Sequence, residues 1–276
     1  MATLPNTEPT LWPRWRLVTL LAGIAVTGLC LLAGLALAAF YAITADTPQL
    51  TIVPGPWPTD PGLPARGEPV RDRIAAEPMI EVQPADARET APAADVAPTI
   101  TVPSATVVGI AGVESGFPRT PAGAVGQLAA IEVHVVEQMS IPTAHAVHQA
   151  WALPGGVEAA EWHLTQAVQA FLTAARQETD RKDETTLIQA IPTAGLVKGV
   201  DGPDWVVACV LMDVRASIVA DARIGWGHCE RMTWEQDRWM IAPGTPPAQA
   251  PSTWPGSEKA LQAGWRTWVE AEPAGG

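Results

Sequence analysis

The chain has 276 residues, of which 47% are hydrophobic, and its formal net charge is −12 with only three lysines. A phosphate-binding surface needs clustered lysine and arginine, so this composition argues against direct nucleic-acid binding. The length allows one or two domains.

An apolar block runs from Leu17 to Ile43 without a charged residue. A membrane-spanning helix needs about 20 apolar residues, whereas the apolar core of a signal peptide has roughly 7–15. The block therefore predicts an uncleaved transmembrane helix over 17–43, and a signal peptide cleaved near Ala36-Leu37-Ala38 is the alternative. Arg14 and Arg16 precede the block, so the positive-inside rule predicts a cytoplasmic tail over 1–16 and a domain outside the cytosol.

Twelve prolines fall between residues 44 and 104, among aspartate, glutamate and arginine. Such a composition cannot bury enough apolar surface to offset the entropy lost on ordering. We therefore expect a disordered, extended linker over 44–104, interrupted at most by a short helix around "VRDRIAAE". The folded domain is expected over 105–272.

Three helices are predicted in the first half of this domain. The first begins with Thr120 as its N-cap and Pro121 at its first helical position, and it runs to about Met139. The second is expected over 143–151. The third is expected over 157–177, with an apolar face that contains leucine, valine and phenylalanine.

The hydrophobic pattern then becomes typical of strands, at 185–200 with a bend at Pro192, at 203–217, at 218–236 and after Arg238. If the chain turns near Val219, Cys209 and Cys229 lie opposite each other on neighbouring strands. A disulfide needs Cβ atoms about 3.5–4.5 Å apart, and an oxidising compartment favours it. Two buried free thiols on one sheet face are the alternative.

The carboxy-terminal part combines a proline-rich stretch with a helical pattern. We expect the prolines between Trp239 and Trp254 to form an ordered strap over the sheet rather than a disordered tail. A helix is predicted over 257–270, because Leu261, Trp265 and Trp268 have helical spacing on one apolar face that must dock on the fold.

Several tryptophans are candidates for a protein-interaction surface. They are Trp226, Trp234, Trp254, Trp265 and Trp268. Packing in the core is the alternative interpretation of each of them.

Histidines suggest a metal site only weakly. His145 and His148 are three apart on a predicted helix, and His163 with Glu158 and Glu161 could complete a set of ligands. The HExxH signature is absent, and histidines near a helix end more often cap it or face solvent. We therefore expect neither a metal nor a cofactor.

A catalytic site is also not expected. His228 precedes Cys229, but neighbouring strand residues point to opposite sheet faces, so this histidine cannot easily activate the thiol. An enzyme of this shape would place Asp213, His228 or Glu230 in a pocket between helices and sheet. We predict no catalytic residue and treat the pocket enzyme as the alternative.

Helices followed by antiparallel strands predict an α+β domain in which helices pack on a curved antiparallel sheet. This order resembles the nuclear transport factor 2-like, or cystatin-like, superfamily. A span, a linker and such a domain together resemble the bitopic scaffold proteins of type IV secretion and conjugation machines. "GFPRTPAGAV" (116–125) and "RWMIAPGTPPAQAPSTWPGSEKALQAGW" (238–265) are similar to motifs of membrane proteins in actinobacterial integrative and conjugative elements.

The resemblance implies a non-enzymatic, single-pass scaffold in the cell membrane that assembles with itself and with other subunits of a DNA-transfer channel. No catalytic residues come with it. The alternatives are a membrane-anchored small-molecule-binding or catalytic domain of the same cone shape, and a cell-wall-binding module, against which the absence of repeats argues.

Overall fold

The computed structural model describes residues 66–217 and 221–271. The predicted tail (1–16), the predicted span (17–43) and the first part of the predicted linker (44–65) lie outside these residues. Within the described ranges, no helix combines the length and the apolar composition needed to cross a bilayer.

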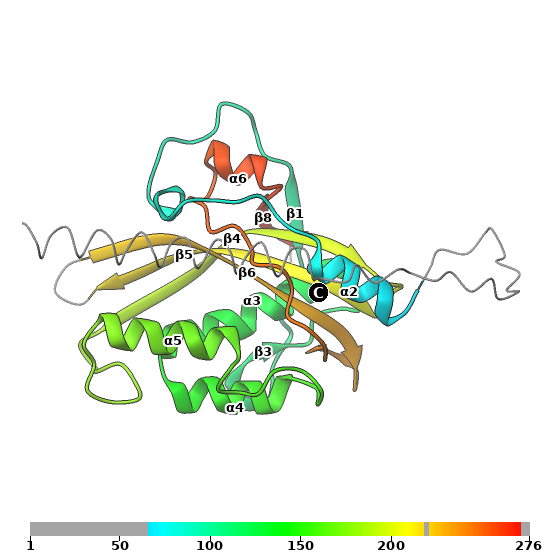
Figure 1. Cartoon of the computed structure of the whole chain (residues 1–276), viewed down its shortest axis with the longest axis horizontal. Helices are drawn as coiled ribbons and strands as arrows, with labels where there is room; N and C mark the ends of the chain where they lie inside the picture. Colours follow the sequence, from blue (N-terminus) through cyan, green and yellow to red (C-terminus); the bar gives the residue numbers. More distant parts are fainter. Residues whose placement is uncertain (1–65, 218–220, 272–276) are drawn as a thin grey trace, which may run out of the picture. The chain divides into compact units, whose positions relative to one another are not determined.

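A six-stranded sheet with the strand order β1-β8-β4-β5-β6-β7 is the centre of the fold (Figure 1). The long strands are β4 (Leu187–Val200), β5 (Trp205–Ser217) and β6 (Asp221–Glu235), followed by the short edge strand β7 (Arg238–Ile241). These four pair in antiparallel order, as predicted, and β4 is irregular between Pro192 and Ala194, where a bend was predicted.

Three helices lie together on one side of the sheet: α3 (Pro121–Gln138), α4 (Ile141–Trp151) and α5 (His163–Ala174) (Figure 1). The predicted start of α3 is confirmed, because the Gly123 N–H donates to Thr120 Oγ1 and Pro121 opens the helix. α5 is shorter than the predicted 157–177. Its N-cap is Trp162, which has an extended backbone and a buried side chain.

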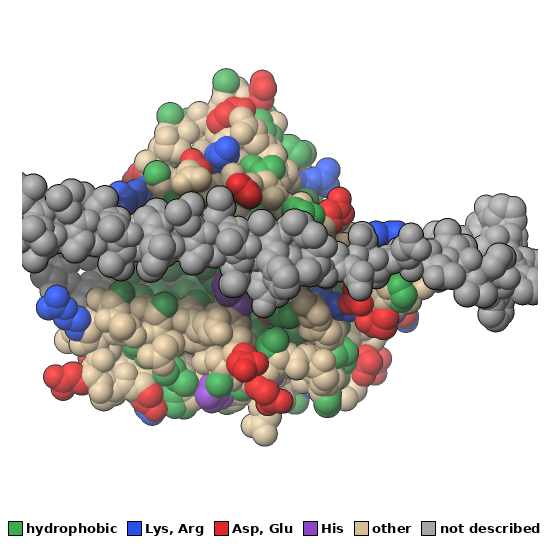
Figure 2. Space-filling view, viewed as in Figure 1, with side chains coloured by type: hydrophobic (Ala, Val, Ile, Leu, Met, Phe, Trp, Pro, Cys, Tyr) green, Lys and Arg blue, Asp and Glu red, His purple; other side chains and the backbone are tan. Residues whose placement is uncertain are grey.

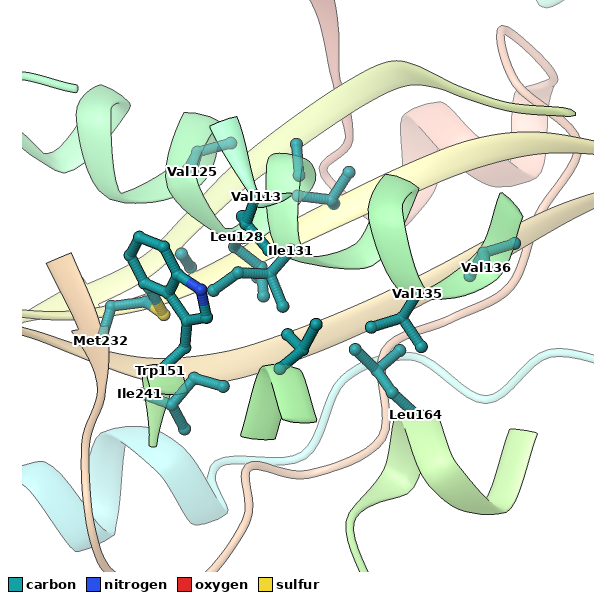
Figure 3. Close-up of a cluster of buried hydrophobic side chains, with 14 of the residues drawn as sticks. Val113, Val125, Leu128, Ile131, Val135, Val136, Trp151, Leu164, Met232 and Ile241 are labelled. Carbon is teal, nitrogen blue, oxygen red and sulfur yellow. The ribbon is translucent and has the colours of Figure 1, made fainter. Parts of the chain in front are cut away.

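The inner face of the sheet and these helices enclose the larger apolar core (Figure 3). Alternate residues of β5 and Met232 of β6 face the helices, where they meet Leu128 and Ile131 of α3, Trp151 of α4 and Leu164 of α5. The intervening residues of β5 form a second core on the outer face. Because both faces of β5 are buried, its sequence is almost continuously apolar.

The linker predicted over 44–104 is wrong for residues 66–104, which belong to the same compact unit as the sheet. The segment contains α2 (Glu68–Ala76), the short 3-10 helix η1 (Pro84–Ala87) and β1 (Thr99–Val102). Arg231 of β6 holds α2 through Asp72 at 2.6 Å and Glu68 at 3.1 Å. Long-range ion pairs and strand pairing therefore order a segment whose own apolar content is low.

The helix predicted over 257–270 is also wrong. Only α6 (Glu258–Gln262) is helical, and the chain then enters β8 (Arg266–Glu270). Gly264 separates the two with a φ of +83°, a left-handed conformation that ends helices. β8 pairs with β4 in antiparallel order and with β1 in parallel order, so the sheet is not purely antiparallel.

The strap, residues 243–256, is ordered as predicted. Its Ser252 Oγ accepts a hydrogen bond from the Gly227 N–H of β6 at 3.1 Å, and its Ala248 N–H donates to the Ala75 carbonyl of α2 at 2.8 Å. The indole N–H of Trp265 donates to the Pro251 carbonyl at 3.2 Å. The strap thus lies along the outer edge of β6 and connects it to α2.

A second, two-stranded sheet pairs β2 (Val107–Val108) with β3 (Glu114–Ser115), and the short 3-10 helix η2 (Ile110–Gly112) connects them. The connection contacts α4, where the indole N–H of Trp151 donates to the Ile110 carbonyl at 3.1 Å. This unit positions β2 at the surface, beside the helical layer.

Candidate functional site

Three ionisable side chains meet in the core between the helices and the sheet. His228 Nδ1 lies 2.9 Å from Glu132 Oε1, and His228 Nε2 lies 3.4 Å from Glu230 Oε1. The indole N–H of Trp162 donates to Glu230 Oε1 at 2.8 Å. We call Glu132, His228 and Glu230 the acid–histidine cluster; all three are buried, as is Trp162.

The fold brings the cluster together from two layers. His228 and Glu230 are two residues apart on β6 and therefore point to the same, inner face of the sheet. There they lie opposite Val210 and Ala208 of β5, which belong to the inner core. Glu132 comes from the middle of α3, one residue after the fully buried Ile131.

Burial changes the acidity of each member of the cluster. It raises the pKa of Glu230 to about 7, although the hydrogen bond from Trp162 works in the opposite direction. Burial, together with the charge of Glu230, raises the pKa of Glu132 well above its usual value. Burial, together with the nearby His163, lowers the pKa of His228. Burial therefore favours the uncharged form of all three groups, and Glu230 is the member whose pKa lies near neutral pH.

One oxygen of the cluster has no protein partner. Within residues 66–217 and 221–271, Glu132 Oε2 is buried without a hydrogen bond. An unpaired buried oxygen of this kind costs about 1–3 kcal/mol, and perturbed carboxyl groups in a buried setting are a recognised sign of a functional site.

A cavity of about 220 Å³ adjoins Glu230 and His228. Its walls come from β6, from α4 and α5 with the loop that connects them, and from the strap. The side chains that line it include His148, Val157, Trp162, His163, Glu230 and Arg231. Because β7 pairs with β6 only from Met232 onwards, this stretch of β6 has no neighbouring strand on that side.

The unpaired edge of β6 offers backbone groups to the cavity. Gly227 directs its N–H to the strap, and Arg231 directs its carbonyl to the Ala242 N–H. Cys229 lies midway between them, so its N–H and C=O point the same way. No backbone group in the described part of the chain bonds to them from that side. The cavity wall therefore carries one backbone donor and one acceptor beside the Glu230 carboxyl group.

Stacked rings flank the cluster. The His163 ring lies 4.8 Å from that of His228, and the Trp226 ring lies 5.4 Å from it, both nearly parallel. His163 is exposed, whereas Trp226 is half-buried and packs against the inner core. Trp226 therefore packs beside the cluster and does not line the cavity described above.

The other tryptophans predicted for an interaction surface are largely occupied within the fold. Trp265 and Trp254 are buried, and Arg223 lies over the Trp254 ring at 4.5 Å, so the surface interpretation is wrong for these two. Trp234 is half-buried and meets the edge of Trp239 at 5.5 Å. Trp268 is half-buried against the inner core. These tryptophans mainly pack within the fold, because both faces of the sheet carry an apolar core.

Two of the three side chains considered for a pocket reach it. His228 and Glu230 line the cavity, but Asp213 lies on the outer face of the sheet, where it binds Arg223 Nε at 2.7 Å and Arg215. Strand alternation explains the difference, because Asp213 has the same parity as Cys209 on β5.

The cysteines lie on the outer face as well. Cys209 and Cys229 are directly opposite in the register of β5 and β6, and they form a disulfide with Cα atoms 4.0 Å apart. His228 therefore points away from the sulfur of Cys229, as the strand argument predicted. Within the described residues no group of three or more histidine, cysteine, aspartate or glutamate side chains is arranged to hold a metal ion.

Sequence reasoning missed Glu132 and Trp162. Glu132 is a lone carboxylate in the apolar run "LAAIEVHVV", and that was the available signal. Trp162 precedes α5 in a polar loop, and no local pattern pairs it with a residue 68 positions further along the chain.

A separate feature is an exposed apolar strand. Val107 and Val108 of β2 are 56% and 73% exposed, and Ile110 of η2 is 55% exposed. We call these three side chains the β2 surface. Among the described strands, β2 pairs only with β3. Its second edge therefore presents unpaired backbone groups next to aliphatic side chains.

Comparison with known proteins adds no identity. No protein-family model, no curated protein and no solved structure matches the chain. The acid–histidine cluster with its cavity and the β2 surface are the features of the described residues that bear on function.

Proposed function

We propose that this protein is a non-enzymatic, single-pass membrane protein that serves as an assembly subunit of a conjugative DNA-transfer channel. In this proposal 17–43 anchors it, the amino terminus is cytoplasmic and the domain of helices on a curved sheet lies outside the cytosol. The apolar block, the motifs at 116–125 and 238–265, and a domain shape compatible with the nuclear transport factor 2-like superfamily support it.

The observation that carries the assembly role is the β2 surface. Natural proteins protect strand edges with charge, proline or covering segments, because an open apolar edge recruits another chain. Here three large aliphatic side chains within four residues, Val107, Val108 and Ile110, are more than half exposed. A partner subunit or a second copy of this chain that adds a strand to β2 would cover them.

The charge of the surface supports protein rather than nucleic-acid partners. Acidic and basic side chains are interspersed on the face of the described residues in Figure 2, and the whole chain carries a net charge of −12. A phosphate backbone would be repelled by such a chain.

Photo-crosslinking in cells tests the proposal. In the full-length protein, a benzoylphenylalanine in place of Val108 is expected to give crosslinked products of higher mass. The same group in place of Val200, an exposed valine on β4, is expected to give none. Val108→Lys is expected to lower the transfer frequency of a resident conjugative element at least about tenfold, the effect of 1.4 kcal/mol lost from a contact. Equal crosslinking at both positions, with normal transfer by Val108→Lys, refutes the assembly role.

A second candidate is a membrane-anchored ligand-binding domain of the same shape. The specific observation that favours it is the cavity beside Glu230, whose pKa of about 7 suits proton exchange at physiological pH. Ligand binding and assembly can coexist in one protein, because the cavity and the β2 surface share no residue.

A further inference from the structure

The charges around the cavity favour a cationic ligand. Glu230 supplies the carboxyl group of the wall. The one arginine in the wall, Arg231, directs its guanidinium group to Glu68 and Asp72 of α2 and is not available for an anion. The remaining titratable groups of the wall are the imidazoles of His148 on α4, His163 on α5 and His228 on β6.

The unpaired backbone edge of β6 favours a ligand that contains an amide group. The N–H and C=O of Cys229 point into the cavity, and an amide group is the natural partner for a donor and an acceptor on one strand residue. The Glu230 carboxyl group follows in the next residue. The wall therefore combines an ammonium acceptor with an amide-binding edge.

The volume limits the size of the ligand. A cavity of about 220 Å³ has room for several water molecules, since one water needs about 10–15 Å³ of such space. A compound of the size of a single amino-acid amide fits this space.

We propose that the cavity binds a small primary ammonium compound with an adjacent amide, such as the amino-terminal residue of a peptide. The Glu230 carboxylate accepts hydrogen bonds from the ammonium group, and the Cys229 backbone pairs with the amide. This inference rests on the ligand-binding candidate above and is independent of the assembly role.

Binding depends on pH in a defined direction. The ammonium group pairs with the ionised carboxylate, and burial raises the pKa of Glu230 to about 7. Affinity is therefore expected to rise from pH 5 to pH 8. In the facing groups, burial raises the pKa of Glu132 and lowers that of His228, so in both it favours the uncharged form.

Calorimetric titration of the full-length protein in lipid nanodiscs tests the proposal with two matched probes. L-alaninamide carries an ammonium group, and lactamide carries a hydroxyl in its place. Alaninamide is expected to bind, more tightly at pH 8 than at pH 5, and lactamide at least about tenfold more weakly, which corresponds to 1.4 kcal/mol. Equal binding of the two probes, or no binding of alaninamide, overturns the proposal.

Variants locate the site. Glu230→Gln keeps an acceptor for Trp162 and is expected to weaken alaninamide binding at least about tenfold, whereas Glu235→Gln, an exposed glutamate on the same strand, leaves it unchanged. Val157→Phe, which adds a ring to the cavity wall and leaves the three cluster residues in place, is expected to abolish binding. It covers the case in which Glu230→Gln does not fold. Alaninamide binding that survives both variants places the site elsewhere.

Crosslinking at Val108 is expected to persist in Glu230→Gln, so failure of this inference and failure of the assembly role are distinguishable.

Discussion

Glu132 on α3 and His228 on β6 meet at 2.9 Å although 96 residues separate them in the chain. Their contact joins the helical layer to the inner face of the sheet, deep in an otherwise apolar core. Each group supplies the hydrogen-bond partner that the other would lack, and a buried polar group without a partner costs about 1–3 kcal/mol. Removing either partner alone is therefore expected to destabilise the fold.

The first prediction concerns stability against pH. Burial raises the pKa of Glu230 from 4.5 to about 7, so between these values the folded state holds a proton that the unfolded state has released. This contribution is complete below pH 4.5 and is lost as the pH rises through 7. The free energy of unfolding of the wild type, relative to Glu230→Gln, is expected to fall by about 3 kcal/mol between pH 4 and pH 8. Urea unfolding at both pH values measures it.

The control for this measurement is Glu235→Gln, an exposed glutamate on the same strand. Its stability is expected to follow the wild type at both pH values. His228 contributes in the opposite direction, because burial lowers its pKa, but it is present in all three proteins. Curves of wild type and Glu230→Gln that stay parallel would show that Glu230 is not desolvated as the structure has it.

The second prediction concerns the disulfide between Cys209 and Cys229. It closes a loop with a sequence separation of 20, and a crosslink of this span stabilises a fold by about 3 kcal/mol through the entropy of the unfolded chain. Replacement of both cysteines by alanine is expected to lower the free energy of unfolding by about this amount. Urea unfolding with Cys30→Ala in both proteins measures it, since Cys30 is the third cysteine. Equal stability would mean that the bond does not form in the native protein.

The third prediction concerns the contact between the strap and β6. A Cβ atom at Gly225 would lie 1.9 Å from the Thr253 carbonyl oxygen, so the strap must move away to accept it. Gly225→Ala is expected to destabilise the fold by about 2 kcal/mol and to speed proteolytic cleavage within 243–256. Gly156→Ala, where the nearest atom is 3.8 Å away, is expected to change stability by less than about 0.5 kcal/mol. An unchanged cleavage rate in Gly225→Ala would show that the strap is not held by this contact.

Local sequence patterns predicted the parts of the fold that local physics decides. Thr120 and Pro121 define the start of α3, and the spacing of Cys209 and Cys229 about the turn gave the register of β5 and β6. The segment 66–104 and β8 were mispredicted, because their order comes from distant partners. Asp72 forms an ion pair with Arg231, and β1 pairs with β8.

The candidate site shows the same limit. Strand alternation correctly separates His228 from Cys229, yet it does not say which face of β6 is covered by helices. Asp213 was therefore considered together with His228 although it lies on the opposite face. Glu132 looks like a surface residue in a mainly apolar helix until its partner on β6 is known. The chemistry of each residue can be recognised in the sequence. Which residues far apart in the chain come into contact could not be predicted from local patterns.

The crosslink between β5 and β6 has a consequence for the chemistry of the inner face. Sliding one strand by a single position would turn every side chain of β6 over, exchanging the imidazole and carboxyl groups of His228 and Glu230 for the guanidinium group of Arg231. Covalent attachment at Cys229, between those two residues, forbids this exchange. Formation of the disulfide thus fixes which side chains of β6, His228 and Glu230 or Arg231, face the interior.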